Sequence, residues 1–195
     1  MKIIEDERVR QRARLLAELN EYPRVGEAIA GLEKALRRGN KILVFGNGGS
    51  ATQSSHFAAE LVNKFYFRRR ALPALALNAD MANVTSIAND EEFRFVFSRQ
   101  VEAFAVKDDV ALGITTSGRS ANVLQALAAA RERGLLTIVL AGRQLEALRA
   151  LPVDIVVAVD AADTPTVQEM HLFLLHVMAE MIEKKLCGGD HGQTV

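Results

Sequence analysis

Two short segments combine glycines with hydroxyl side chains directly after an apolar run. Residues 46–50 read Gly-Asn-Gly-Gly-Ser and follow the run 41–45, and residues 115–120 read Thr-Thr-Ser-Gly-Arg-Ser and follow the run 109–114. Glycines let the backbone turn tightly and approach a ligand closely. Hydroxyl and free N–H groups at the start of the next helix favour an anion there. Two such loops on one sheet predict a small phosphorylated ligand that is held from both sides.

Each loop also has a structural interpretation. Ser50 and Ser120 open the helices expected after the two loops, and serine is a good N-cap residue in its own right. The first loop further fits a loose dinucleotide-binding fingerprint through Gly46, Gly48 and Ala51. That fingerprint needs an acidic residue about 20 positions on, where this chain has a run of arginines. A nicotinamide cofactor is therefore disfavoured, and a Walker loop is excluded because no Gly-Lys-Ser/Thr follows.

A histidine and a glutamate lie one helical turn apart just beyond the first loop. His56 and Glu60 are spaced i and i+4, which places them on one face of a helix. An imidazole and a carboxylate at this spacing can hold one metal ion or form a structural hydrogen bond, and the spacing leaves both interpretations open. A further polar cluster, Gln168-Glu169-Met170-His171 followed by His176, lies near the end of the chain.

Alternating apolar runs and helical patterns indicate the elements that would position these groups. Helical patterns at about 50–64, 92–105, 120–133 and 143–150 separate five expected strands. The strands are expected at 41–45, 74–77, 109–114, 136–141 and 153–159, each buried on both faces. The alternation predicts an α/β fold with a doubly wound, five-stranded parallel sheet and helices on both faces. Ligands of such sheets bind beyond the carboxyl ends of the strands, where both loops fall.

Helical patterns also occupy both ends of the chain. Residues 1–38 read as two helices, the second with Pro23 in its first turn. The last helix, 164–186, is apolar around much of its circumference, so it needs more partners than one sheet face offers. We expect the N-terminal segment 1–38 to cover part of it and a second copy of the chain to cover the rest. The tail 187–195 is expected to be mobile.

Length, charge and cysteine content narrow the class of protein. The 195 residues suit one domain, 1–195, and the 24 basic and 24 acidic residues balance, which gives no support for nucleic-acid binding. Cys187 is the one cysteine, which fits a cytoplasmic location. Met1 to Arg10 has no apolar segment typical of a signal peptide. No apolar stretch is long enough to span a membrane, so we expect no membrane partner.

Together these motifs resemble those of the SIS (sugar isomerase) family, and within it those of the phosphoheptose isomerases. The resemblance runs over nearly the whole chain. Besides the loop at 46–50, it is carried by His-Phe-Ala-Ala-Glu-Leu at 56–61, Leu-Pro-Ala-Leu-Ala-Leu at 72–77, Ile-Ala-Asn-Asp at 87–90, Phe-Ser-Arg-Gln-Val-Glu-Ala at 97–103, Thr-Ser-Gly at 116–118 and Gln-Glu-Met-His at 168–171.

The resemblance implies an aldose–ketose isomerase that converts D-sedoheptulose 7-phosphate to D-glycero-D-manno-heptose 7-phosphate. It also implies one zinc ion per site and a homotetramer with sites at subunit interfaces. Whether the product would feed lipopolysaccharide, capsule or another heptose pathway stays open.

The resemblance also implies a role for each matching residue. Glu60 and His176 would be the proton-transfer pair, and Glu60 and Gln168 would also contact the substrate. Zinc would be bound by His56, Glu60, Gln168 and His176. Asn89 and Asp90 would contact the sugar hydroxyls. The sugar phosphate would be bound by Asn47, Gly48, Gly49, Ser50, Thr115, Thr116, Ser117 and Ser120.

Three positions depart from the usual pattern of the family. Thr115 stands where a serine is common and keeps a hydroxyl group. Arg119 replaces a frequent asparagine and adds a charge near the phosphate, and Thr166 stands where an arginine commonly precedes the Gln-Glu pair. The last two bear on substrate recognition rather than on the chemistry.

Aldose–ketose isomerisation needs a base, an acid and a group that stabilises the enediolate oxygen. Glu60 is the expected base, His176 the expected proton shuttle, and zinc would polarise the carbonyl. Gln168 and His176 are, however, eight residues apart, about 12 Å along a helix at roughly 1.5 Å per residue. Both would reach one ion only with strain, so we expect a neighbouring chain to complete the site.

Other functions stay open beside the isomerase. A non-catalytic SIS protein that binds the bacterial replication initiator would lack the catalytic carboxylate and histidine, whereas this chain has both Glu60 and His176. The sequence separates an isomerase of sedoheptulose 7-phosphate poorly from a sugar-phosphate sensor without turnover, or from an isomerase of another sugar phosphate.

Overall fold

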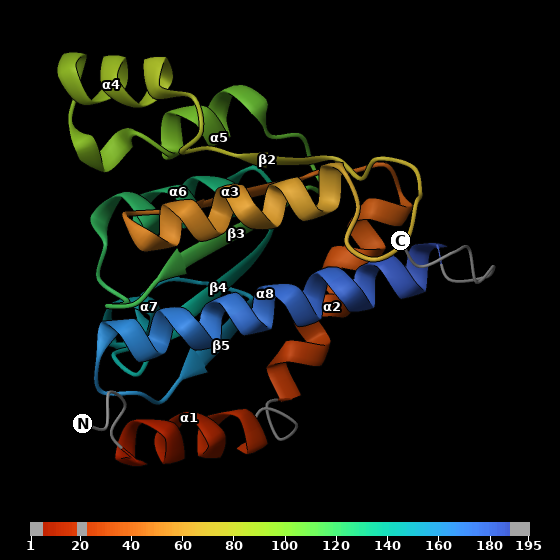
Figure 1. The fold of residues 1–195 in the computed structure, drawn as a ribbon. Helices are drawn as coiled ribbons and strands as arrows, with labels where there is room; N and C mark the ends of the chain where they lie inside the picture. Colours follow the sequence, from red (N-terminus) through yellow and green to blue (C-terminus); the bar gives the residue numbers. More distant parts are fainter. Residues whose placement is uncertain (1–5, 19–22, 188–195) are drawn as a thin grey trace.

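A computed structural model describes residues 6–18 and 23–187, and its centre is a five-stranded parallel sheet (Figure 1). The strand order is β2-β1-β3-β4-β5, and all four pairings are parallel. The strands are β1 (Ile42–Gly46), β2 (Ala74–Ala76), β3 (Val110–Thr115), β4 (Leu136–Gly142) and β5 (Ile155–Val159). The expected fold class, a parallel sheet with helices on both faces, is confirmed.

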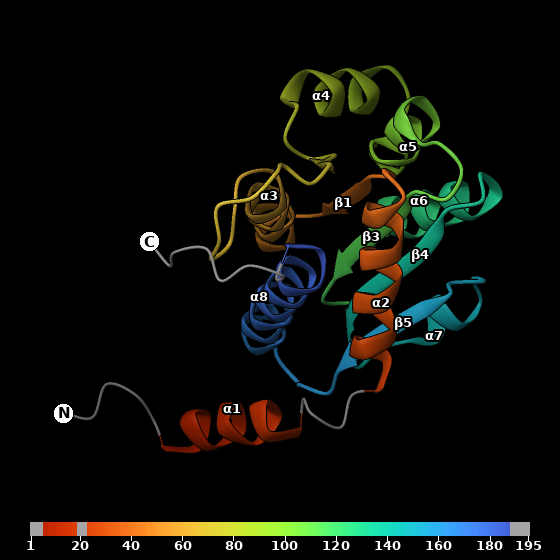
Figure 2. The ribbon, with the colours of Figure 1, turned by 90° about the vertical axis from the view of Figure 1, so that its right-hand side faces the viewer.

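The described residues form eight α-helices, six of which cover the sheet in two layers (Figure 2). Helices α2, α3 and α8 pack on one face, and α5, α6 and α7 pack on the other. The bounds are α1 (Asp6–Glu18), α2 (Pro23–Arg37), α3 (Gly49–Val62), α4 (Met81–Asp90), α5 (Ser98–Phe104), α6 (Ala121–Glu132), α7 (Glu146–Arg149) and α8 (Thr164–Cys187).

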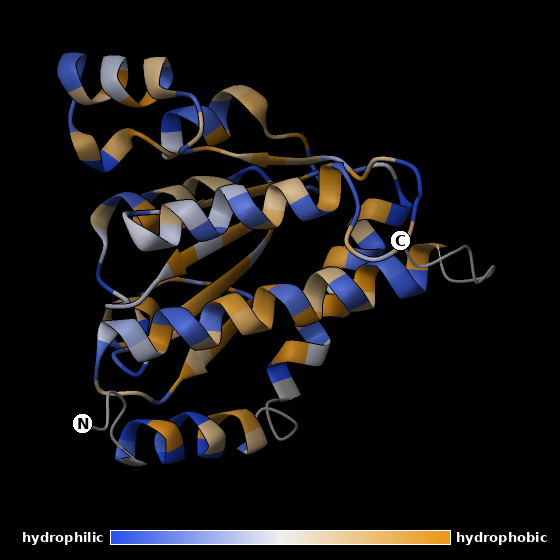
Figure 3. Cartoon of the chain, in the orientation of Figure 1, coloured by the Kyte–Doolittle hydropathy of each residue, from blue (hydrophilic) through white to orange (hydrophobic). Residues whose placement is uncertain are grey.

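The central strands are apolar throughout because both of their faces are covered (Figure 3). In β1, Ile42 and Val44 face α2, α3 and α8, while Leu43 and Phe45 face α5 and α6. All four side chains are fully buried. The edge strands differ from the expectation of burial on both faces: β5 alternates between buried and half-buried positions, and Leu75 of β2 is 38% exposed. An edge strand has a neighbour on one side alone, so its cover is less complete.

One helix was not expected from the sequence. Helix α4 is ten residues long and has no buried residue; Val84, Ile87 and Ala88 pack only partly buried against the core, and so short an apolar stripe is a weak sign of a helix in the sequence. It begins after Asp80, whose carboxylate accepts hydrogen bonds from the backbone N–H groups of Ala82 and Asn83. The helix expected at 92–105 is instead a 3₁₀ turn, Phe93–Phe95, followed by α5.

The N-terminal helices lie against α8. Helix α2 packs on α8 and the sheet, and it begins at Pro23 as the sequence predicts. Helix α1 lies farther out (Figure 2) and is tied to α8 by the ion pair between Arg12 and Glu169. Of the tail 187–195, expected to be mobile, Cys187 is the last residue of α8, and residues 188–195 lie outside the described residues. Within the described residues no helix is long and apolar enough to cross a membrane.

Candidate functional site

The two loops lie side by side because their strands are neighbours in the sheet. Strand β1 pairs with β3 in register, from Ile42 opposite Val110 to Gly46 opposite Ile114. The strand order reverses between β1 and β3, since β2 lies on one side of β1 and β4 and β5 lie beyond β3. Parallel sheets bind ligands in the crevice at such a reversal, outside the carboxyl ends of the strands. The fold therefore places both loops at the position where a ligand is expected.

The first loop turns sharply into α3. Gly48 has φ 54° and is the N-cap residue of α3, a conformation that glycine adopts without strain. Ser50 is buried inside the first turn, so it is not the cap. A Cβ atom on Gly49 would collide with the side-chain amide of Gln168. At the start of α3, Gly48 and Gly49 therefore present backbone without side chains, and the side-chain amide of Gln168 packs on Gly49.

The second loop presents its hydroxyl groups in a similar way. Ser120 is the N-cap residue of α6, but within the described residues its side chain makes no capping hydrogen bond. Its hydroxyl lies 3.1 Å from that of Thr115. Ser117 accepts a hydrogen bond from the backbone N–H of Arg119, and Gly118 has φ 64°. The capping interpretation of the two serines therefore finds no support, and backbone N–H groups at both helix starts are left for an anion.

A pair of asparagines joins the two loops. The side-chain amides of Asn47 and Asn122 exchange two hydrogen bonds of 2.8 Å, and Asn122 is 2% exposed. Asn122 also accepts a hydrogen bond from the backbone N–H of Val123. The pair holds the loop after β1 at a set distance from the start of α6. The side-chain amide of Asn47 is therefore engaged within the protein, so a ligand would meet this residue through its backbone.

The proposed metal and proton-transfer residues meet across two helices. Helices α3 and α8 run side by side (Figures 1 and 2). His56 Nε2 lies 2.9 Å from His176 Nε2 and 3.4 Å from Glu60 Oε1. Two imidazole nitrogens at this distance share one proton, so one ring donates and the other accepts. The structure thus brings together His56, Glu60 and His176, of which the histidines are 120 residues apart in sequence.

The surroundings of His176 favour its neutral form. Burial lowers the pKa of His176, the neighbouring His56 lowers it further, and Glu60 opposes the shift. The Phe65 ring lies 5.7 Å from the His176 ring, measured between centroids. A neutral imidazole near neutral pH can accept a proton and return it.

Gln168 lies at a different place on α8. Its amide is packed against Gly49, and its backbone carbonyl accepts a hydrogen bond from Gln53. Gly49 and His56 are seven residues apart on α3, which is about 10 Å along the helix. Within one chain, Gln168 therefore belongs to the loop end, and the His56–Glu60–His176 cluster lies two turns away.

The nitrogen and oxygen atoms of this cluster are of the types that bind a divalent ion, and the distances between them partly match those around such an ion. Zinc held at about 2.0–2.1 Å by tetrahedral ligands separates two ligand atoms by about 3.3 Å. The distances of 2.9 and 3.4 Å from His56 Nε2 bracket that value. Among residues 6–18 and 23–187, however, no group of three or more His, Cys, Asp or Glu side chains is arranged to hold a metal ion. His56 is thus spaced to share a metal ion with Glu60 or with His176, but the described residues of one chain do not form a complete set of metal ligands.

The remaining candidate residues, Asn89, Asp90, Thr166 and Arg119, lie outside the histidine cluster. Asn89 and Asp90 end α4, both exposed, with Asn89 donating to Asp90 at 2.8 Å. Thr166 is buried and donates its hydroxyl and backbone N–H to Asp163, so it helps to start α8. Arg119 lines a hollow of about 170 Å³ beside the second loop, together with Arg143 and other residues. The structure gives Thr166 a structural role and leaves Arg119 free to meet an anion.

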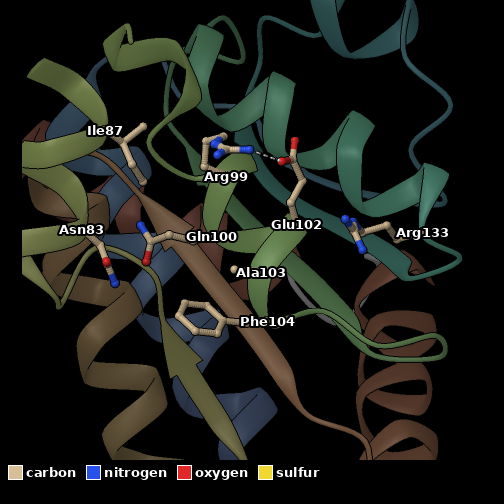
Figure 4. A pocket seen from close by; sticks show the side chains of 8 residues that line it. All are labelled: Asn83, Ile87, Arg99, Gln100, Glu102, Ala103, Phe104 and Arg133. Carbon is tan, nitrogen blue, oxygen red and sulfur yellow. Dashed lines mark hydrogen bonds and ion pairs between the residues drawn. The ribbon is translucent and has the colours of Figure 1, made fainter. Parts of the chain in front are cut away.

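A larger hollow, about 430 Å³, lies away from both loops (Figure 4). Several of its polar groups are already paired: Arg99 with Glu102 at 2.8 Å, and Gln100 with the carbonyl oxygens of Leu77 and Val96 at 2.7 Å. No candidate residue of the sequence analysis lines it. We place the site at the two loops and the neighbouring His56–Glu60–His176 cluster, because the groups that can bind a phosphate and transfer a proton lie there.

Sequence reasoning did not identify several residues that shape the site. Asn122, which ties the loops together, and Gln53, which holds α8, were not singled out. Arg69 lies in the run of arginines at 68–70, yet its side chain is 3% exposed and paired with Glu183. Partners more than 100 residues apart leave no periodic signal, so Glu183 could not have been matched to Arg69 from spacing alone.

Comparison with known proteins agrees with this geometry. The sequence model of the SIS domain matches residues 9–142. A phosphoheptose isomerase of Pelobacter propionicus is 48% identical over 164 residues, 84% of this chain and 86% of that protein. The solved phosphoheptose isomerase of Neisseria gonorrhoeae has a TM-score of 0.84 at 36% identity and covers 91% of this chain and 96% of its own. That of Francisella tularensis has a TM-score of 0.86 at 32% identity, covering 92% and 96%.

The fold and the two loops thus define a SIS domain. At this identity and coverage, the chain belongs to the phosphoheptose isomerases, enzymes of the SIS domain family.

Proposed function

We propose that this protein is an aldose–ketose isomerase that converts D-sedoheptulose 7-phosphate to D-glycero-D-manno-heptose 7-phosphate in the cytoplasm. The observation that supports it most is the His56–Glu60–His176 cluster, two helical turns beyond a phosphate-type loop on the same helix. Glu60 and His176 both contact His56, and a carboxylate close to a neutral imidazole is what an isomerase needs for moving protons between neighbouring carbons. The similar proteins are named phosphoheptose isomerases, which supports a heptose phosphate as the substrate.

The two loops would hold the phosphate. The helix starts offer backbone N–H groups at Gly48 and Gly49, and the second loop offers the hydroxyl groups of Thr116, Ser117 and Ser120. Helix N-termini favour an anion through these N–H groups and the helix dipole. Binding at this remote end would position the sugar carbons for reaction. Asn89 and Asp90 would contact the sugar hydroxyl groups from α4.

Glu60 would remove the proton from the carbon beside the carbonyl, which leaves an enediolate. His176 would carry the proton between the two oxygens, and the carboxyl group of Glu60 would return its proton to the neighbouring carbon. The product is an isomer, so no oxidant or further reactant is consumed. The short contact between His56 and His176 would hold the His176 ring in one orientation.

A zinc ion would be held by His56, Glu60 and His176, with Gln168 supplied by a neighbouring chain. When bound, zinc would polarise the substrate carbonyl and stabilise the negative oxygen. The incomplete donor set within one chain and the position of Gln168 support a site shared between subunits of a homotetramer. Mixed nitrogen and oxygen ligands suit zinc without excluding other divalent ions.

The experiment is an isomerase assay with sedoheptulose 7-phosphate, before and after treatment with a chelator. We expect turnover that falls on chelation and returns when zinc is added back. Glucose 6-phosphate serves as the control substrate, because it tests whether the enzyme distinguishes a six-carbon from a seven-carbon sugar phosphate. Binding of sedoheptulose 7-phosphate without turnover would indicate a sensor instead, and neither binding nor turnover would favour a non-catalytic SIS protein.

A further inference from the structure

The first part of the connection from α3 to β2, residues 63–70, is built around a buried ion pair. It starts directly after the helix that carries His56 and Glu60, and it lies next to the last turns of α8 (Figure 1). The pair is Arg69 with Glu183, 3.0 Å from Arg69 Nε to Glu183 Oε1, with side chains 3% and 0% exposed. None of the functions argued above uses either residue.

Glu183 organises the backbone of this segment. Its carboxylate accepts hydrogen bonds from three successive backbone N–H groups, those of Phe65 at 2.9 Å, Tyr66 at 2.6 Å and Phe67 at 3.0 Å. Burial alone would raise the pKa of Glu183, but these three donors and Arg69 outweigh it, so the pKa lies below its usual value. A carboxylate with four N–H donors is held in one place.

Arg69 holds the end of the helix that carries the proposed base. Its guanidinium donates to the carbonyl oxygen of Glu60 at 2.7 Å and to that of Leu61 at 2.8 Å, with a third bond to Asn63 at 3.2 Å. The last carbonyl groups of a helix have no partner within the helix. Arg69 supplies partners for them, and one of these carbonyls belongs to Glu60 itself.

The same segment reaches the proposed proton shuttle. The Phe65 ring packs against His176 at 5.7 Å and against Tyr66 at 4.4 Å, measured between ring centroids. Glu183 lies seven residues after His176 on α8, so two helical turns separate them. The ion pair therefore links the end of α3 to the α8 residues around His176 through a single short segment.

We propose that Arg69 and Glu183 are positioning residues for the isomerase: their ion pair fixes Glu60 on α3 relative to His176 on α8 and presses Phe65 against the His176 ring. The proposal rests on the proposed function. It predicts that loosening the pair slows the chemical step while leaving phosphate binding intact, because the loops lie at the opposite end of α3 from residue 63.

The main test is Glu183→Gln, which keeps the shape of the side chain and removes its charge. Glu180→Gln is the matched control, since Glu180 is one turn earlier on α8 and pairs with Lys184 on the surface. We expect kcat for sedoheptulose 7-phosphate to fall about 10- to 100-fold in Glu183→Gln, the size of effect that a misplacement near 1 Å can cause. KM should stay within about twofold, as uniform binding is unchanged. The control should match the unmodified protein in both constants.

Unchanged kcat in folded Glu183→Gln would overturn the proposal, as would a loss of activity that only follows the fraction of unfolded protein. Should Glu183→Gln fail to fold, Phe65→Leu decides, because Phe65 is half-buried and the ion pair is untouched. A lower kcat at unchanged KM in that variant supports the proposal, and a full kcat contradicts it.

A readout without catalysis separates this proposal from the proposed function. Imidazole nitrogen resonances of His56 and His176 can be followed by NMR in both glutamate variants. We expect them to shift in Glu183→Gln and not in Glu180→Gln. If the unmodified protein shows no isomerase activity, the proposed function fails. A shift confined to Glu183→Gln would then still establish the coupling, and its absence would refute it.

Discussion

At the level of single residues, the chemistry depends on few side chains. Among the residues that the structure describes, Glu60 has the carboxylate in contact with the histidine pair, at 3.4 Å from His56. His176 is held between His56 and Phe65. Both residues were predicted from the sequence, but the contact between His56 and His176 was not. The spacing of His56 and Glu60 had left a merely structural hydrogen bond open.

Replacing Glu60 tests the assignment of the base. We expect Glu60→Gln to lower kcat by about 10²- to 10⁴-fold, the usual contribution of a positioned base. Steady-state kinetics with sedoheptulose 7-phosphate measure it. Glu102→Gln is the control, because Glu102 lies in the hollow of Figure 4 and pairs with Arg99 on the surface. Full turnover in Glu60→Gln would exclude Glu60 as the base.

His171 leads to a prediction about stability. It is fully buried, donates from Nε2 to the Ala141 carbonyl at 3.2 Å, and its Nδ1 has no partner within the described residues. Burial lowers the pKa of His171 to about 4, below its ordinary value of about 6.5. Between these values the unfolded chain binds a proton at this residue that the folded chain does not. Stability is therefore lost as the pH falls through this window.

The variant His171→Gln removes this titration and keeps an N–H donor for Ala141. We expect the unfolding free energy of the unmodified protein to fall more steeply between pH 7 and 5, by up to about 1.4 kcal/mol per pH unit. Urea unfolding at several pH values measures the two slopes. His176 titrates in both proteins and cancels in the comparison. Equal slopes would contradict the neutral buried state of His171.

At the level of elements, the contact between α3 and α8 decides the site. Each helix alone carries half of the reactive set, and the helices meet at two places: Gly49 with Gln168, and His56 with His176. The close approach at Gly49 is possible because a glycine has no Cβ atom. The first loop therefore depends on how α8 is seated.

A methyl group at Gly49 tests this dependence. We expect Gly49→Ala to displace the Gln168 amide and to raise KM for the sugar phosphate about 10-fold, the effect of losing one hydrogen bond to a charged group. Gly26→Ala is the control, because a Cβ atom there has no neighbour within 4 Å. Kinetics and competition by inorganic phosphate measure the change. An unchanged KM in Gly49→Ala would show that the start of α3 does not contact the phosphate.

At the level of the whole molecule, the question is whether one chain makes a complete site. Gln168 lies at the loop end and the histidine cluster lies two turns away, so a site that uses both needs two chains. Exposed apolar side chains on α1, α4 and α8, among them Val9, Met81 and Phe173, are consistent with contact between copies.

Mixing two inactive variants tests the shared site. Glu60→Gln and Gln168→Ala each remove one contribution. If the sites are shared, equal mixing by unfolding and refolding should restore about a quarter of full activity, because each contribution comes from an intact chain half the time. Light scattering of the same samples should give a tetramer. No restored activity, or a fully active monomer, would contradict the shared site.

The sequence alone determined those strands and loops that are encoded by patterns of a few neighbouring residues. Apolar runs with turn residues marked all five strands, and Gly-Asn-Gly-Gly-Ser at 46–50 marked a ligand loop, because period and turn chemistry act over a few residues. Helix α4 was missed, since its apolar stripe is short and only partly buried. The tertiary structure alone decided that β1 lies beside β3, that His56 meets His176, and that Glu183 holds the segment after Glu60. These contacts join residues more than 60 positions apart, and they form only when both faces of the sheet are packed.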